Sequence, residues 1–352
     1  MAEENELDTF TTENLSKLTY PRDDLHHVTV RPEDLERYLP LDNGRHSFDK
    51  ITSNLGKLDV LPLEILQMFL SHLDLQTITT LRSVNKCARL YVDSVPEYQK
   101  ILAHAPSVLR ASIGTGAATW ITCTQLFDTL VNPICCRCPD FAPFIYLLTG
   151  QRVCYVCLCH YDDFLPISPA MARRTYELSD ESIVALNRII VLPGSYSRCG
   201  AKRKGGSALV DRTAALSAWR AEREEEGEDS GSPPSIPSKG KQPSIGDLNS
   251  NRFVATVRAP WLNVETNATE EGFSCSLCQS RFYSGGWNGN GRSFWERMFT
   301  TRTFLEHVRE CPSLRDRGFP GGNFERGGLQ EKYILEHMQS IVEDSEGSFS
   351  IW

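Results

Sequence analysis

The sequence lacks any run of about 18 consecutive apolar residues, the length that a membrane-spanning helix requires. Its first six residues include Glu3, Glu4 and Glu6, whereas a secretory signal begins with positive charge followed by an apolar stretch. Both absences predict an intracellular protein, in the cytoplasm, the nucleus or both, with no membrane partner.

An excess of positive charge is also missing. The 37 lysines and arginines are outnumbered by 45 aspartates and glutamates, which gives a formal net charge of -8. The whole molecule therefore cannot be a nonspecific binder of polyanions, and nucleic acid is not an expected partner. A short basic patch at Arg198, Lys202, Arg203 and Lys204 could be a nuclear import signal or contact phosphate, but the pattern favours a solvated loop.

Familiar catalytic motifs are absent too. The sequence contains no P-loop, no glycine fingerprint for a dinucleotide, no nucleophile elbow and no protein-kinase motif. A catalytic Cys/His pair can be assembled from twelve cysteines and eight histidines, but no motif selects one. We therefore expect a protein that is not an enzyme.

What is present is an ordinary globular composition, with 40% hydrophobic and 23% charged residues over 352 positions. We predict an α-rich α+β fold, in which a three-helix segment precedes an irregular, metal-stabilised region with small hairpins. The expected divisions are a largely irregular leader (1–57), the three-helix segment (58–104), a first cysteine-rich region with helices (105–221), a disordered acidic, Ser/Pro-rich insert (222–250), a second cysteine-rich segment (251–315) and a C-terminal tail with a helix (316–352).

Local patterns predict several elements. Pro62 is suited to a helix start, and the apolar residues that follow recur at helical spacing. Asp74 and Asn85 can cap a second and a third helix. Further along, the sequence predicts a hairpin over residues 144–156, helices near 120–130, 182–190 and 208–223, and a strand over 252–257. The plainest interpretation of the first three helices is a core in which Leu and Ile pack inward.

Two pairs of cysteines form the first cluster. Cys135 and Cys138 are separated by 15 residues from Cys154 and Cys157, a spacing typical of a four-cysteine zinc site. Four ligands close the tetrahedron that zinc prefers and leave no position for an activated water. Cys136, Cys159 and His160 lie close enough to replace one of these ligands, and the alternative to a metal site is a set of buried thiols.

The second cluster combines Cys275 and Cys278 with His307 and Cys311, which lie one helical turn apart on a shared face. The intervening 28 residues make a compact ββα finger improbable, and alternatives are a core histidine or a redox-type CxxC. We expect two structural zinc ions, one in each cluster.

The three-helix segment resembles the F-box, because it carries Leu61-Pro62-x-Glu64-Ile65-Leu66 followed by Leu73-Asp74-Leu75 and Val84-Asn85-Lys86. The resemblance implies a surface for a Skp adaptor and, through it, a cullin. The residues expected at that surface are Leu61, Pro62, Ile65, Leu66, Leu70, Leu73, Leu75, Ile78, Leu81 and Val84.

Most of residues 58–315 also resemble a group of fungal F-box proteins that carry a CxxC segment, an apolar stretch and Arg-Val-Cys-x-x-Cys, here residues 152–157. This resemblance implies a non-catalytic substrate receptor of a Skp/cullin/F-box ubiquitin ligase that recruits an unknown protein target. One alternative is a zinc-dependent protein associated with nucleic acid or transcription. Another is an enzyme with catalytic zinc, which would need an open coordination position.

Overall fold

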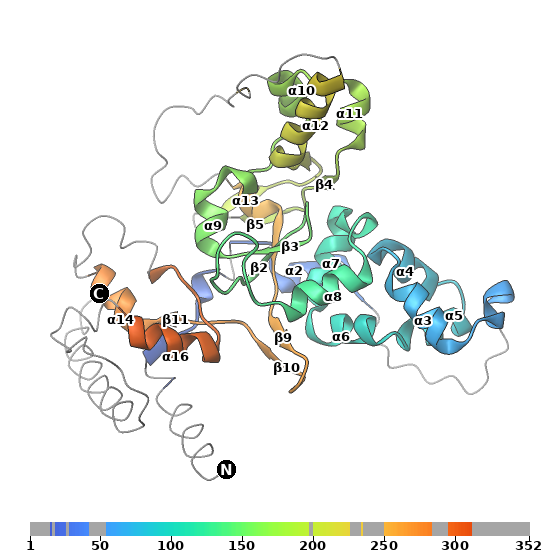
Figure 1. The fold of residues 1–352 in the computed structure, drawn as a ribbon, viewed down its shortest axis with the longest axis horizontal. Coiled ribbons are helices and arrows are strands. Elements are labelled where there is room, and N and C mark those ends of the chain that lie inside the picture. The colour runs from blue at the N-terminus through green and yellow to red at the C-terminus, as the bar shows by residue number, and fades with distance from the viewer. Residues whose placement is uncertain are drawn as a thin grey trace, which may run out of the picture. The chain divides into compact units, whose positions relative to one another are not determined.

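The computed structural model describes residues 15, 18–25, 28–41, 54–196, 200–225, 234, 250–283 and 295–311. They fall into two compact units (Figure 1): a larger one, Asp23–Glu271, and a smaller one that combines Met1–Arg22 with Gly272–Trp352. Most of the predicted disordered insert and the whole predicted tail, 316–352, lie outside the described residues. None of the described helices is long and apolar enough to cross a membrane.

The three predicted helices of residues 58–104 are present as α3 (Leu63–Ser71), α4 (Leu75–Arg82) and α5 (Lys86–Asp93). Both predicted caps are confirmed. The Asp74 carboxylate accepts a hydrogen bond from the Thr77 amide at 2.8 Å, and the Asn85 side chain accepts one from the Ala88 amide at 2.8 Å. These caps satisfy amides that the first turn of each helix leaves without an intrahelical partner.

The chain continues through α6 (Pro96–His104), α7 (Pro106–Thr115) and α8 (Cys123–Val131), and α8 packs on α3. The predicted helix near 120–130 is therefore present. Backbone hydrogen bonds join α8 to the α3–α4 turn, with the Cys123 amide donating to the Leu73 carbonyl at 3.0 Å and the Leu75 amide donating to the Ile121 carbonyl at 2.9 Å. The helices on the two sides of this junction share one core rather than forming separate modules.

The leader is more ordered than the sequence predicts. It contains β1 (Thr19–Tyr20), the 3-10 turns η1 (Asp23–Leu25) and η2 (Gly56–Val60), and α2 (Pro32–Tyr38), which packs against α7. The apolar residues in this stretch are too sparse to show a period. Five of them are nevertheless buried, because long-range packing rather than a local pattern defines their environment: Leu18, Leu25, Val28, Val30 and Leu35.

The predicted hairpin is confirmed as β2 (Phe144–Tyr146) paired antiparallel with β3 (Gln151–Val153). The third strand of this sheet is β8 (Thr256–Arg258), which pairs with the other edge of β2. Residues 252–257 were predicted to be entirely strand, but a short helix, α13 (Asn251–Val254), precedes β8. The helical turn allows the buried Arg252 side chain to donate to the Leu158 carbonyl at 3.0 Å.

The sequence predicts that residues 251–271 belong to the second cysteine-rich segment. In the structure they belong to the larger unit instead. They continue from β8 into a hairpin of β9 (Trp261–Asn263) and β10 (Ala268–Glu270), and β9 packs against α8. The Trp261 indole donates to the Val131 carbonyl at 2.7 Å. Cysteine spacing alone placed the boundary too early, because it carries no information about which sheet a strand joins.

A second helical group consists of α10 (Pro169–Tyr176), α11 (Asp180–Ala185) and α12 (Arg212–Glu225), with α10 packed against both others (Figure 1). The helix predicted near 182–190 ends at Ala185, and β4 (Arg188–Ile190) follows and pairs with β7 (Ala208–Val210). The β-branched pair Ile189-Ile190 favours the strand. Between β4 and β7 in the sequence, β5 (Gly194–Tyr196) and β6 (Ala201–Arg203) form another hairpin.

Arg152 on β3 holds the larger unit together. Its side chain is 3% exposed and donates to the carbonyls of Thr129, Leu130, Ala142, Ala259 and Pro260. The guanidinium thus joins α8, the β2–β3 hairpin and the segment before β9. Replacing it leaves these buried acceptors without their donor, which is among the costlier changes in a core.

We expect Arg152→Met to lower the free energy of unfolding by about 3 kcal/mol or more, because several buried carbonyls lose a charged donor. Urea unfolding followed by circular dichroism measures the change. Arg174→Met is the matched control, since Arg174 on α10 is exposed. Equal midpoints for the two variants would contradict the structural role given to Arg152.

Candidate functional site

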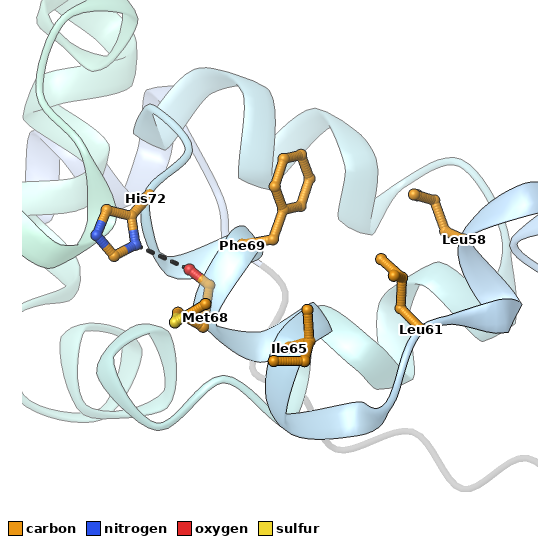
Figure 2. A pocket seen from close by; sticks show the side chains of 6 residues that line it. All are labelled: Leu58, Leu61, Ile65, Met68, Phe69 and His72. Carbon is orange, nitrogen blue, oxygen red and sulfur yellow. Dashed lines mark hydrogen bonds between the residues drawn. The ribbon is translucent and has the colours of Figure 1, made fainter.

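An apolar groove opens on α3 and η2 (Figure 2). Its lining comes from one face of α3 and from the turn that precedes it, and consists of Leu58, Leu61, Ile65, Met68, Phe69 and His72. At one end the His72 ring donates through Nδ1 to the Met68 carbonyl at 2.8 Å, which fixes the imidazole. The groove has a volume of about 480 Å³ and is open to solvent.

The groove residues are unusually exposed for their type. Ile65, Met68 and Phe69 are 44%, 57% and 48% exposed. Further exposed apolar side chains lie nearby in the sequence at Val60 and Leu63. Contiguous apolar surface of this kind marks an interaction site in soluble proteins, because leaving it in water is unfavourable.

The first cysteine cluster assembles as predicted. The sulfurs of Cys135, Cys138, Cys154 and Cys157 all lie within 4.8 Å of one another. Cys138 Sγ is 3.6 Å from both Cys154 Sγ and Cys157 Sγ. In a zinc tetrahedron with bonds of about 2.3 Å, neighbouring sulfurs are about 3.8 Å apart. The measured separations fit a metal of that size.

Local backbone positions these four thiols. Cys154 is the N-cap of α9 (Tyr155–His160), and its sulfur accepts a hydrogen bond from the Cys157 amide at 3.3 Å. The Cys154 amide in turn donates to Cys135 Sγ at 3.3 Å. Cys136, Cys159 and His160, the possible substitutes, are not part of the group that the structure brings together.

The second cluster unites Cys275, Cys278, His307 and Cys311, all buried. Cys278 Sγ lies 3.5 Å from His307 Nε2 and 3.6 Å from Cys311 Sγ. A zinc ion with S and N ligands would set these separations at about 3.6 and 3.8 Å. His307 lies on α16 (Thr301–Glu310), whose N-terminus is stabilised by a capping box at Thr300. The His307 ring stacks on the Phe299 ring, with the two centroids 4.3 Å apart.

The chemistry of both groups favours a cation. The Cys275 thiol donates hydrogen bonds to the neighbouring sulfurs of Cys278 and Cys311, and these bonds together with burial raise the pKa of Cys275 well above its usual value. Burial raises the pKa of Cys138 to about 12. The closely packed thiols of either group cannot all ionise beside one another at neutral pH by themselves, whereas a divalent ion stabilises the thiolates. Each group is therefore suited to hold a metal ion with four protein ligands.

A family model for the F-box domain matches residues 58–100. This segment of the chain is an F-box domain. It spans η2, α3, α4 and α5 and the beginning of α6, so the apolar groove belongs to it. No curated protein and no solved structure matches the chain.

The F-box residues predicted to meet an adaptor divide into two sets. Leu61, Pro62, Ile65 and Val84 are exposed, and Leu73 and Leu81 are half-buried. The remaining four are at most 1% exposed and lie in the interior: Leu66, Leu70, Leu75 and Ile78. We leave these four out of the adaptor surface, because their side chains form the packed side of amphipathic helices.

The predicted adaptor surface omitted four groove residues: Leu58, Met68, Phe69 and His72. For Met68 and His72, the sequence did contain a signal, which is their helical spacing from Leu61 and Ile65. Positions 61, 65, 68 and 72 follow a spacing of four, three and four, which places them on one stripe of a helix. The stripe through positions 66 and 70 is equally apolar, so periodicity alone could not show which stripe faces solvent.

Residues of the N-terminal segment pack beside the second cluster. Its strand β1 pairs with β11 (Ser274–Cys275), with Thr19 opposite the ligand Cys275. Leu18 is 2% exposed and belongs to the same apolar cluster as Phe304 and the cluster cysteines. No cysteine or histidine occurs in this strand, so ligand spacing gave no hint of its role.

Deleting residues 1–22 should therefore weaken metal binding at the second cluster about tenfold while sparing the first, because the strand supports a ligand without touching the ion. A chelator competition that follows metal release from each site measures this. Deleting only residues 1–14 is the control, since it retains β1. Identical release for the two deletions would contradict a supporting role for the strand.

Proposed function

We propose that the chain is a substrate receptor of a Skp/cullin/F-box ubiquitin ligase. The observation that carries this proposal is the solvent-exposed apolar groove on the F-box domain, since F-box domains typically bind a Skp-type adaptor and through it a cullin. Leu61, Ile65 and Phe69 are the anchors that the adaptor would bury. Buried apolar anchors at the centre of an interface supply most of its affinity.

The rest of the chain would hold the protein target. It catalyses no bond change under this proposal; its effect is to keep the target close to a ubiquitin-charged enzyme, so that transfer gains from proximity and orientation. The junction between α3–α4 and α8 supports this role. Besides the two backbone bonds described above, the Thr124 hydroxyl donates to the Ser71 carbonyl at 2.8 Å. A receptor joined rigidly to its F-box holds a target at a defined position.

We further propose that both cysteine clusters hold structural zinc. The separations between ligand atoms support this, as does the ligand set, because thiolate and imidazole ligands in a closed tetrahedron are typical of structural zinc. Zinc would fix segments that contain little continuous regular structure, including the loop of Cys135 and Cys138.

Affinity purification of the full chain followed by mass spectrometry tests the function. We expect a Skp-type adaptor and a cullin among the recovered proteins, together with candidate targets. Recovery of nucleic-acid machinery without any adaptor would favour the alternative, a zinc-dependent protein associated with nucleic acid or transcription.

A further inference from the structure

Met68 is the only sulfur-containing residue among the six that line the groove. It lies on α3, one helical turn after Ile65 and one turn before His72 (Figure 2). Met68 is 57% exposed, more than Leu61, Ile65 or Phe69. Solvent and small oxidants therefore reach its thioether in the free chain.

The chain contains five methionines, of which Met1 and Met338 lie outside the described residues. Met298 is 2% exposed, and Met171 is partly buried against the core that α10, α11 and α12 share. A peroxide must collide with the sulfur that it oxidises, so an exposed methionine reacts before a buried one. Position distinguishes Met68 further, because its side chain belongs to the surface on which the proposed function depends.

Oxidation changes the polarity of a methionine and is reversible. A sulfur lone pair attacks one oxygen of hydrogen peroxide, an S=O bond forms, the O–O bond breaks, and the second oxygen leaves as water with both protons. The product, methionine sulfoxide, is polar and chiral where the thioether was apolar. Methionine sulfoxide reductases reverse the step, because two thiols become a disulfide while the sulfoxide oxygen leaves as water.

The side chains that line the groove offer a sulfoxide oxygen no hydrogen-bond donor. His72 is the only lining residue with a polar side chain, and its Nδ1 already donates to the Met68 carbonyl at 2.8 Å. In the neutral ring this bond leaves Nε2 as an acceptor. Water would hydrate the sulfoxide in the free chain, whereas a bound adaptor would bury it in apolar contact. Burying a polar group without a partner is unfavourable.

The helix itself tolerates this change. Its packed side is formed by Leu66 and Leu70, which are at most 1% exposed, and Met68 is not part of that side. The Met68 carbonyl accepts hydrogen bonds from the Ser71 hydroxyl at 3.0 Å and from the His72 ring, and neither bond involves the sulfur. Oxidation of Met68 therefore alters the binding surface while α3 stays folded.

We propose that Met68 is a redox-sensitive modification site, at which oxidation by a peroxide closes the groove to a Skp-type adaptor and reduction of the sulfoxide reopens it. This proposal rests on the proposed function, because it concerns regulation of the same groove. A substrate receptor acts only while it is attached to its adaptor. One oxygen atom on Met68 thus detaches the receptor from the ligase under oxidising conditions without unfolding it.

The test exposes the full chain to hydrogen peroxide, removes the oxidant and measures the affinity for a purified Skp-type adaptor by titration calorimetry. Peptide mass spectrometry counts the sulfoxide at each methionine. We expect Met68 to oxidise well before Met298, and we expect the affinity to fall about thirtyfold, because a polar group is buried without a partner. Treatment with sulfoxide reductases for both sulfoxide epimers and a thiol should restore the affinity.

Variants assign the loss of affinity to one sulfur, since peroxide also reacts with cysteines. Met68→Leu has no thioether in the groove, so its affinity, whatever its value before treatment, should be the same after peroxide. The matched control is Met171→Leu, which retains Met68 and should lose affinity like the unchanged chain. Met68→Gln places a permanent polar group in the groove and should bind the adaptor weakly without any oxidant.

The untreated chain separates this proposal from the proposed function. If peroxide weakens Met68→Leu as much as the unchanged chain, or if a chain with oxidised Met68 binds the adaptor as tightly as before, this proposal alone is overturned. An untreated, folded chain that binds no adaptor would contradict the proposed function and this proposal with it.

Discussion

Replacing Ile65 and Phe69 with aspartate is expected to abolish binding of a Skp-type adaptor while leaving the fold intact. Both side chains are nearly half exposed in the free chain, so the substitutions disturb little internal packing. In the complex each carboxylate would be buried against an apolar partner surface without a counter-charge. We expect a loss of about 4 kcal/mol, or about a thousandfold in the dissociation constant, measured by titration calorimetry.

The control for this variant is Val184→Asp. Val184 on α11 is 71% exposed and lies outside the groove, so it offers the same chemical change at a site with no proposed partner. Matched circular dichroism spectra for the variants establish equal folding. If the double variant and Val184→Asp bind adaptor equally well, the groove is not the adaptor surface.

Removing a ligand from the second cluster is expected to unfold the smaller unit. Among the described residues of this unit, the buried apolar cluster has eight members, and three of them are the ligands Cys275, Cys278 and Cys311, so this small core depends on the metal site. Structural zinc contributes apparent binding energies of about 10 to 16 kcal/mol in small domains. We expect Cys278→Ala to carry one metal ion per chain instead of two and to lose protection of residues 273–311 in hydrogen exchange.

Elemental analysis counts and identifies the metal in this experiment. Cys123→Ala is the matched control, because Cys123 is fully buried on α8 but belongs to neither cluster. It should retain two ions. Adaptor binding should survive in Cys278→Ala, since the groove lies in the other unit. A wild-type chain with fewer than one ion, whose thermal unfolding is unchanged by chelator, would show that these cysteines are ordinary core residues.

The metal-ligand sets could be predicted from the sequence because ligand geometry imposes short spacings. A CxxC turn, or a His and a Cys one turn apart on a helix, brings two ligands together locally, and only the pairing of the two halves depends on the fold. The structure unites the predicted four residues in each cluster. The caps at Asp74 and Asn85 were predictable for the same reason, since a cap acts within three residues.

Features that depend on distant partners could not be predicted in this way. The β1 strand carries no chemical motif, and only its pairing with β11 gives it a role. The same holds for β8, which joins a hairpin more than a hundred residues earlier in the chain. Within the F-box, Leu66 and Ile65 are adjacent and equally apolar, yet Leu66 is buried and Ile65 is exposed. Which of the two is buried depends on how distant helices such as α5 and α8 pack against α3.

Hydrogen exchange of the full chain with and without a purified Skp-type adaptor tests the central claim most directly, because it reports both binding and its location. The account predicts slower exchange in residues 58–72, which form the groove, and no change in residues 273–311 of the smaller unit. Absence of binding, or binding that protects other segments while residues 58–72 exchange as in the free chain, would contradict it.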